Sequence, residues 1–249
     1  MLLGTIDEIA WMSHFSKIYS TTDNTSILSV TGSGFFLPVL SFSVPEVIKA
    51  IRSSSSNKAP GPDGVPVDVF KSEPDVWGPV LTNILNAAVQ FGVPEAWGAS
   101  KIVPIFKKGD RNSPACYRPI SLINSVVKVI GATLLDRMSK WAEARHLFTW
   151  AQYGFRKKLS TVDQGLNLHL ICAKYTLAKR ESIYLAFMDL SQAFDCVDRN
   201  KLWDMLYSIG MDENIIVFLR QLHASTTAKV VMDEYGSMSG EISINRGVR

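Results

Sequence analysis

Three aspartates stand close together after a strongly apolar stretch of the sequence. Asp189 follows the run Ile183–Met188, and Asp195 and Asp198 come within the next nine residues. A carboxylate that closes a buried strand is costly unless it reaches solvent, pairs with a cation or binds a metal ion. Asp195 and Asp198 can each be explained as the cap of the helix that follows. Asp189 is harder to explain in this way, so it is the first candidate for metal chemistry.

A second group of side chains suited to chemistry is basic. Residues 101–128 carry six cations against the single acid Asp110: Lys101, Lys107, Lys108, Arg111, Arg118 and Lys128. The formal charge of the whole chain is only +3, which is a weak argument for nucleic acid. A solvated loop explains Lys107 or Lys108 singly just as well as a phosphate site does. Arg118, flanked by Tyr and Pro in a strand pattern, is the better candidate.

Apolar periodicity predicts the elements that must position these side chains. Helices are predicted around Ile9–Tyr19, over 43–53, 79–91, 161–179 and 212–224, from Ser121 to Trp141, and through Leu202 and Leu206. Strands are predicted over 101–106 and 117–120, as a hairpin with a basic loop, and twice within 228–245. The near-continuous apolar run Ile183–Met188 is typical of a strand buried on both faces. Residues 53–66 read as a linker by composition alone.

Several motifs, in order, resemble the reverse transcriptases of non-LTR (LINE-type) retrotransposons. The run from Phe187 to Arg199 is similar to palm motif A of that family. The fingers motifs are matched by residues 58–64, 104–110, 117–122 and 152–156 with 160–161, and residues 246–249 resemble the start of palm motif B. Group II intron maturases are the nearest rival, but residues 58–64 and 193–195 look more like the retrotransposon branch. Under this resemblance the linker reading of residues 53–66 gives way to a Pro/Gly turn within the fingers.

The resemblance implies an RNA-directed DNA polymerase that uses two Mg²⁺ ions, an RNA template, a DNA primer and deoxynucleoside triphosphates. It assigns Asp189 as the bridging metal ligand and the backbone carbonyl of Leu190 as a second contact. Lys107 or Lys108 and Arg118 would face the triphosphate.

Three further roles follow from the same resemblance. Phe194 matches the position whose ring crowds the 2′ carbon of the sugar and rejects ribonucleotides, with a core aromatic as the alternative. Gln152 and Arg156 are assigned to the template, although a Gly-Phe-Arg turn is common.

The fold expected from this resemblance is α+β: the fingers and an incomplete palm of a right-hand polymerase, helix-rich with a small antiparallel palm sheet. Residues 1–42 are expected to form a lead-in segment, 43–180 the fingers, and 181–249 a partial palm.

The sequence contains no Tyr-x-Asp-Asp turn and no other Asp-Asp pair. We therefore expect the C-terminal palm and the thumb to be missing and the chain alone to be inactive. A non-catalytic RNA-binding fragment is the alternative. An unrelated phosphoryl-transfer enzyme with Asp189 as nucleophile needs a phosphate-binding Gly loop, and the sequence has neither GxGxxG nor a P-loop.

Composition agrees with a globular protein and excludes several classes. Of the 249 residues, 47% are hydrophobic and 20% charged, which argues against wholesale disorder and coiled coil. The three cysteines are too scattered for a disulfide framework or a zinc site. No apolar run approaches a membrane span and the N-terminus lacks a secretory pattern. We expect an intracellular protein, cytoplasmic and/or nuclear, with no membrane partner.

Overall fold

The computed structural model describes residues 6–20, 40–180, 182–233 and 235–248. Two compact units are present, one formed by residues 1–133 and 192–249 and the other by residues 134–191. Residues 1–5 and 21–39 of the expected lead-in segment, and Arg249 at the end of the last motif, lie outside the described residues.

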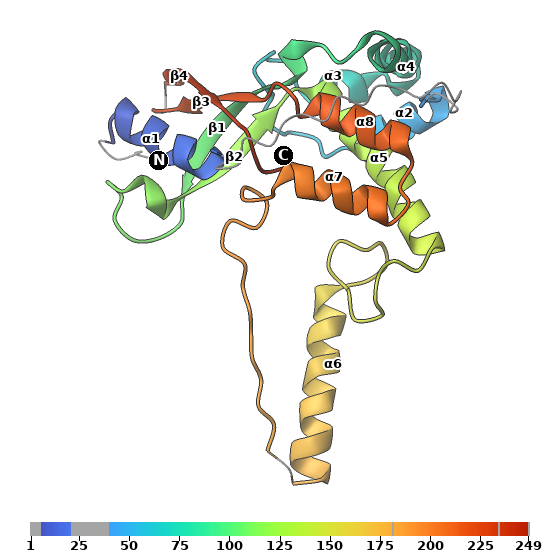
Figure 1. The fold of residues 1–249 in the computed structure, drawn as a ribbon, viewed down its shortest axis with the longest axis vertical. Helices are drawn as coiled ribbons and strands as arrows, with labels where there is room; N and C mark the ends of the chain where they lie inside the picture. Colours follow the sequence, from blue (N-terminus) through green and yellow to red (C-terminus); the bar gives the residue numbers. More distant parts are fainter. Residues whose placement is uncertain (1–5, 21–39, 181, 234, 249) are drawn as a thin grey trace. The chain divides into compact units, whose positions relative to one another are not determined.

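The first unit is built on a four-stranded sheet of order β2-β1-β3-β4 (Figure 1). The predicted hairpin is confirmed: β1 (Ala99–Phe106) pairs antiparallel with β2 (Tyr117–Ile123). β3 (Thr227–Val231) pairs antiparallel with β4 (Met238–Ser243) but parallel with β1. The prediction of an antiparallel sheet is therefore wrong at its centre. Each hairpin joins strands that are close in the sequence, whereas the pairing of β1 with β3 depends on the long chain between them.

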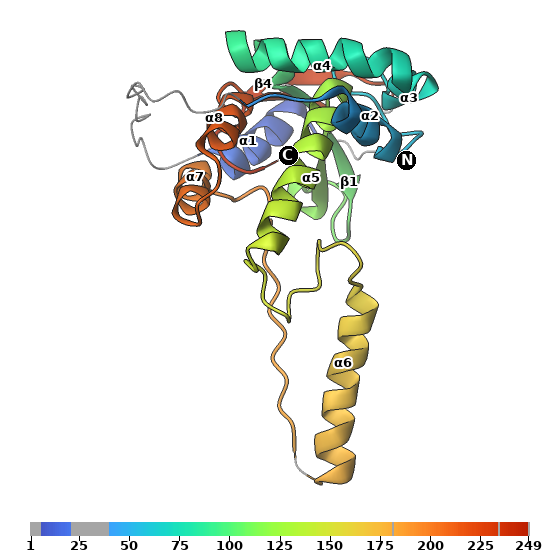
Figure 2. The same cartoon turned by 90° about the vertical axis from the view of Figure 1, so that its right-hand side faces the viewer.

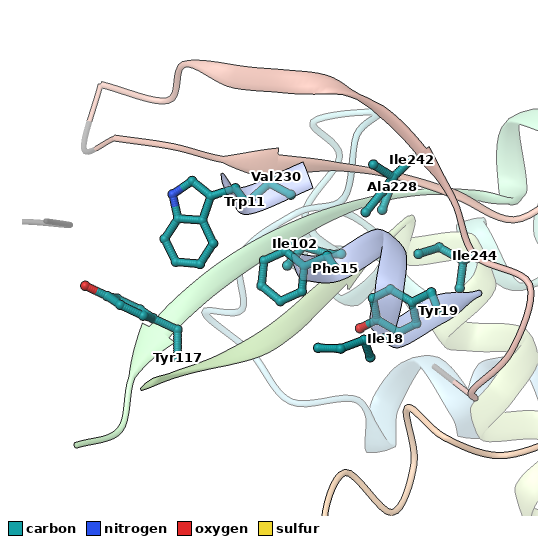
Figure 3. Close-up of a cluster of buried hydrophobic side chains, with 10 residues drawn as sticks. All are labelled: Trp11, Phe15, Ile18, Tyr19, Ile102, Tyr117, Ala228, Val230, Ile242 and Ile244. Carbon is teal, nitrogen blue, oxygen red and sulfur yellow. The ribbon is translucent and has the colours of Figure 1, made fainter. Parts of the chain in front are cut away.

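Helix α1 (Glu8–Tyr19) packs against this sheet, as Figure 3 shows. The helix predicted around Ile9–Tyr19 is confirmed, and the Asp7 carboxylate caps it by accepting from the Ala10 amide at 2.7 Å. Its buried side chains join those of the sheet in one cluster: Trp11, Phe15, Ile18, Tyr19, Ile102, Tyr117, Ala228, Val230, Ile242 and Ile244. Each large apolar side chain buried in this way contributes about 1.5–3 kcal/mol. The helix is thus part of the core of this unit.

Helix α2 (Val44–Ser53) begins and ends where the sequence predicts. The Glu46 carboxylate accepts from the backbone amide of Ser43 at 3.1 Å and from its hydroxyl at 2.6 Å, which fixes the first turn. α3 (Val67–Ser72) and α4 (Pro74–Phe91) follow, and α2 packs against α4 (Figure 2). α4 starts five residues before the predicted Pro79, because Pro74 occupies its first turn and Pro79 is accommodated inside the helix.

Two further helices of the first unit follow the turn of residues 192–198 along the chain. α7 (Arg199–Ser208) and α8 (Glu213–Leu222) pack on each other, and each is capped by an aspartate, Asp198 and Asp212. Two short 3₁₀ turns, η1 (Glu95–Trp97) and η2 (Pro114–Cys116), precede β1 and β2. The helix predicted from Ser121 to Trp141 is α5 (Ser125–Ala144), which contributes to both units. Its predicted start is wrong, because residues 121–123 continue strand β2.

The second unit contains the end of α5, α6 (Thr161–Ala173), the π-helical turn η3 (Lys174–Ala178) and residues 182–190. The helix predicted over 161–179 is confirmed, and its apolar repeat faces solvent in part, because Leu166 and Leu170 are 55% and 56% exposed. The predicted strand Ile183–Met188 is also wrong. These residues lie outside every strand, and Phe187 and Met188 are 82% and 95% exposed.

The missing strand has a physical explanation in the sheet itself. A strand that is buried on both faces needs a position inside a sheet. In the described residues the central positions belong to β1 and β3, and the pairing partners of both are already in place. Residues 182–190 pair with none of these strands and run as a single extended segment, orange in Figure 1.

No helix of the described residues is long and apolar enough to cross a membrane.

Candidate functional site

Asp189 and Leu190 lie in the extended segment 182–190 of the second unit, and both are exposed. Within the described residues, no group of three or more His, Cys, Asp or Glu side chains is arranged to hold a metal ion. Carboxylate and carbonyl oxygens are nevertheless the donors that Mg²⁺ prefers, and Mg²⁺ is often bound by one or two carboxylates together with substrate phosphates. The donors of Asp189 and Leu190 therefore suit one Mg²⁺ ion that arrives with a nucleotide.

Lys107 and Lys108 are exposed in the loop of the β1–β2 hairpin. Backbone contacts order this loop: the Lys107 amide donates to the Cys116 carbonyl at 2.9 Å, and Gly109 has a φ of +99°. The Arg111 guanidinium lies 4.5 Å from the centre of the Phe106 ring. Because the loop is held at both ends, the two lysine side chains extend into solvent from a defined backbone.

Arg118 lies on the face of the hairpin away from α1. Its neighbour Tyr117 is buried in the α1 cluster, and side chains alternate along a strand, so Arg118 points to the opposite face. Its register partner on that face is Ile105, which is partly exposed, as is Ile120. The same face carries Lys101 beside Lys229 of β3. This arrangement offers cations next to apolar surface, which suits a phosphorylated aromatic ligand.

Phe194 is 58% exposed in a turn of the first unit, so packing in the core does not account for its ring. Its two acidic neighbours have separate tasks. Asp198 accepts from the amides of Asn200 and Lys201 and caps α7, as its alternative reading predicted. Asp195 instead accepts from the Tyr19 hydroxyl at 3.1 Å. Burial raises the pKa of Asp195, and the hydrogen bond from Tyr19 opposes this rise.

Gln152 and Arg156 lie in the loop between α5 and α6. The Arg156 guanidinium forms a bidentate pair with Glu143, with nitrogen to oxygen distances of 2.8 and 2.7 Å. It also donates to the carbonyls of Thr149 and Gln152. The hydrogen bonds from Arg156 lower the pKa of Glu143. These contacts of Arg156 stabilise the loop in which it lies. The Gln152 side chain donates to the Gly154 carbonyl of the same loop at 3.1 Å.

The Pro/Gly turn of residues 58–64 is docked against the start of α5. A side chain at Gly61 would place its Cβ 2.5 Å from the backbone nitrogen of Asn124, so only glycine fits. The Asn124 side chain accepts from the Asp63 amide, and the Lys128 ammonium donates to the Ala59 carbonyl at 3.0 Å. This turn is therefore a built part of the first unit and not a linker.

The predicted site residues fall into two sets. Lys107, Lys108, Arg118 and Phe194 belong to the first unit, and Asp189, Leu190, Gln152 and Arg156 belong to the second.

Sequence reasoning did not single out two residues of the first unit, Tyr19 and Arg199. Arg199 carried a signal, because a cation in the first turn of a helix opposes the helix dipole and needs other partners. Tyr19 carried none, since its partner Asp195 is 176 residues away.

Comparison with known proteins gives a consistent result. Residues 105–241 match the family model described as reverse transcriptase (RNA-dependent DNA polymerase). A probable RNA-directed DNA polymerase from transposon BS of Drosophila melanogaster is 35% identical over 166 residues, which cover 65% of this chain and 18% of that protein. An uncharacterized 149 kDa protein of transposon TX1 from Xenopus laevis is 28% identical over 82% of this chain and 15% of its own length.

A third relative is a Pol polyprotein from retrotransposable element R2 of Popillia japonica, 25% identical over 77% of this chain and 26% of that protein. The chain thus spans less than a third of the length of each of these relatives.

Proposed function

The chain belongs to the reverse transcriptase family and is a domain of the non-LTR retrotransposon type, and from this premise we propose how its residues serve RNA-directed DNA synthesis. The proposed substrates are deoxynucleoside triphosphates, a DNA primer and an RNA template. In the proposed division, residues 43–180 belong to the fingers and residues 181–249 to part of the palm.

One observation carries the proposal: a single hairpin presents Lys107, Lys108 and Arg118 to solvent on an ordered backbone. A triphosphate carries several negative charges, and a planar guanidinium and two point charges both suit phosphate oxygens. Partly exposed Ile105 and Ile120 on the Arg118 face offer apolar surface for a base. In the proposed role, this face holds the incoming nucleotide.

Asp189 and the Leu190 carbonyl are the proposed ligands for the Mg²⁺ that accompanies the nucleotide. When bound, Mg²⁺ neutralises charge on the triphosphate and on the attacking oxygen. The task of these two residues is to supply hard oxygen donors to the ion.

Phe194 is the proposed selector of the sugar. Its exposed ring lies in a turn whose backbone carbonyls at Phe194 and Val197 accept hydrogen bonds from Val248 and Gly247. An aromatic ring in van der Waals contact with the 2′ carbon leaves no room for a hydroxyl. Gln152 and Arg156 are proposed to shape the template-facing loop, with Arg156 acting through its pair with Glu143.

A non-catalytic RNA-binding role is the second candidate, and the exposed lysines of the hairpin loop favour it as well. A measurement of nucleotide binding distinguishes the polymerase role from the RNA-binding role. We expect the full chain to bind dATP in the presence of Mg²⁺, and Arg118→Ala to weaken this binding about tenfold or more by isothermal titration calorimetry.

Arg52→Ala is the matched control, because Arg52 is an exposed arginine that pairs with the likewise exposed Asp75 of α4. RNA binding without any Mg²⁺-dependent binding of dATP would replace the polymerase proposal with the second candidate.

A further inference from the structure

The segment after β4 lies directly against the turn that carries Phe194. The Gly247 amide donates to the Val197 carbonyl at 2.8 Å, and the Val248 amide donates to the Phe194 carbonyl at 3.0 Å. Gly247 has a φ of +84°, and a Cβ there would lie 2.7 Å from the Asp195 carbonyl oxygen. Only glycine meets both demands. Residues 244–248 and residues 194–198 are therefore two facing backbones with hydrogen bonds between them.

Arg199 holds residues 244–248 in place. It is the first residue of α7 and is only 9% exposed. Its Nε donates to the Gly247 carbonyl at 2.8 Å, and its Nη1 donates to the Ile244 carbonyl at 3.0 Å. The Thr226 hydroxyl and the His223 carbonyl also accept from Nη1, at 2.9 and 2.8 Å. One guanidinium therefore forms hydrogen bonds to three segments: the chain after β4, the start of β3 and the end of α8.

This geometry is specific to arginine. A buried cation is costly unless its donors are satisfied, and here acceptors converge on both Nε and Nη1. The five N–H groups of arginine form a rigid fork, whereas lysine has three donors on a single nitrogen. A lysine at position 199 keeps the charge but cannot reach the Gly247 and Ile244 carbonyls with the same geometry.

The end of α1 contacts both of these backbones. The Tyr19 hydroxyl donates to Asp195 in the turn. In residues 244–248, the Asn245 amide donates to the Tyr19 carbonyl at 3.1 Å and the Arg246 guanidinium donates to the Ile18 carbonyl. The Phe194 ring remains 58% exposed although its backbone is bound, which is the arrangement expected of a side chain that must meet a ligand at a fixed position.

We propose that Arg199 is a positioning residue for sugar selection, because its guanidinium holds residues 244–248 against the turn and so fixes the backbone of Phe194. This inference rests on the proposed function of Phe194 and adds a residue that does not itself touch the nucleotide. Weaker hydrogen bonds from residue 199 to residues 244–248 let the Phe194 ring move away from the 2′ carbon. Selection between deoxyribonucleotides and ribonucleotides then falls while binding of the triphosphate remains.

The test uses the full chain and compares Arg199→Lys with Arg52→Lys, the same change at a surface arginine. Two quantities are measured: hydrogen exchange at the amides of Gly247 and Val248, and the ratio of the affinities for dATP and ATP in Mg²⁺. In Arg199→Lys we expect exchange at both amides to rise at least about tenfold. We expect the dATP preference to fall toward that of Phe194→Val, while dATP affinity stays within about threefold of wild type.

Thr226→Val is a second, milder variant that keeps the test decisive if Arg199→Lys does not fold. It keeps the shape of the side chain but removes one acceptor of Arg199, so a smaller change in the same direction is expected. Faster exchange with an unchanged preference, or no change in either quantity, overturns the positioning role and leaves the proposed function standing. A wild-type chain that binds both nucleotides equally overturns the role of Phe194 and this inference together.

Discussion

The Tyr19 hydroxyl and the Asp195 carboxylate, 3.1 Å apart, connect the first helix of the chain to the turn that carries Phe194. The Ser121 hydroxyl of β2 also forms a hydrogen bond with Tyr19. Burial and the nearby negative charge of Asp195 raise the pKa of Tyr19, so it remains a neutral donor. A helix outside the recognised motifs therefore contributes directly to the geometry of the turn.

Removing this hydroxyl has a pH-dependent effect on stability. Burial raises the pKa of Asp195 above 3.8. Protonated Asp195 therefore stabilises the folded chain fully below pH 3.8, and this contribution to the unfolding free energy is lost as the pH rises through the raised pKa. The hydrogen bond from Tyr19 limits that loss. Tyr19→Phe should therefore cost about 1–2 kcal/mol of unfolding free energy at pH 7 and less below pH 3.8, measured by urea denaturation.

Ser121→Ala serves as the comparison for Tyr19→Phe, because it removes a partner of Tyr19 and leaves the Asp195 contact intact. A cost of Tyr19→Phe that is the same at both pH values contradicts the role assigned to Asp195.

Metal-dependent nucleotide binding should depend on Asp189. Asp189→Asn removes the charge but keeps the shape, so affinity for dATP in Mg²⁺ should fall about tenfold while binding without Mg²⁺ stays the same. Because Asp189 lies in an exposed segment, we expect the melting temperature of this variant to equal that of the wild type. Asp204→Asn, at an exposed position on α7, is the control. Equal losses in both variants, or none in Asp189→Asn, argue against a metal role.

Single-stranded RNA should bind through the hairpin loop with little sequence preference. For single strands, the logarithm of the affinity falls with the logarithm of salt by about 0.7 per neutralised phosphate. The double change Lys107→Ala and Lys108→Ala should therefore lower that slope by about 1.4 as well as the affinity, measured by fluorescence anisotropy at several salt concentrations. Lys17→Ala with Lys49→Ala removes the same charge from exposed positions on α1 and α2. If both pairs reduce the slope equally, the loop is not the site.

Core and exposed leucines should differ sharply in their contribution to stability. Leu85 on α4 is 0% exposed, so Leu85→Ala should lower the unfolding free energy by about 2–5 kcal/mol. Leu166→Ala and Leu170→Ala on α6 should each cost less than about 1 kcal/mol, because these side chains are more than half exposed. Denaturation curves give both values. A large loss at Leu166 or Leu170 indicates that the apolar face of α6 is buried in solution.

Local patterns in the sequence were sufficient for elements whose partners are near in the chain. Ser43 and Glu46 form a capping box three residues apart, and the β1–β2 hairpin is closed by a ten-residue loop, so their geometry depends on neighbours. The motif order identified the family, because those residues recur at recognisable spacing. The sequence alone also named Arg118 and Phe194, and their observed exposure is compatible with the predicted roles.

Only the tertiary structure decided what depends on distant partners. The apolar run Ile183–Met188 has the composition of a buried strand, but burial requires neighbouring strands, and composition does not tell whether they are present. The parallel junction of β1 and β3 joins residues more than a hundred positions apart. Arg199 joins three segments because four of their acceptors converge on one buried guanidinium. No local spacing encodes such a convergence, since it is created by packing.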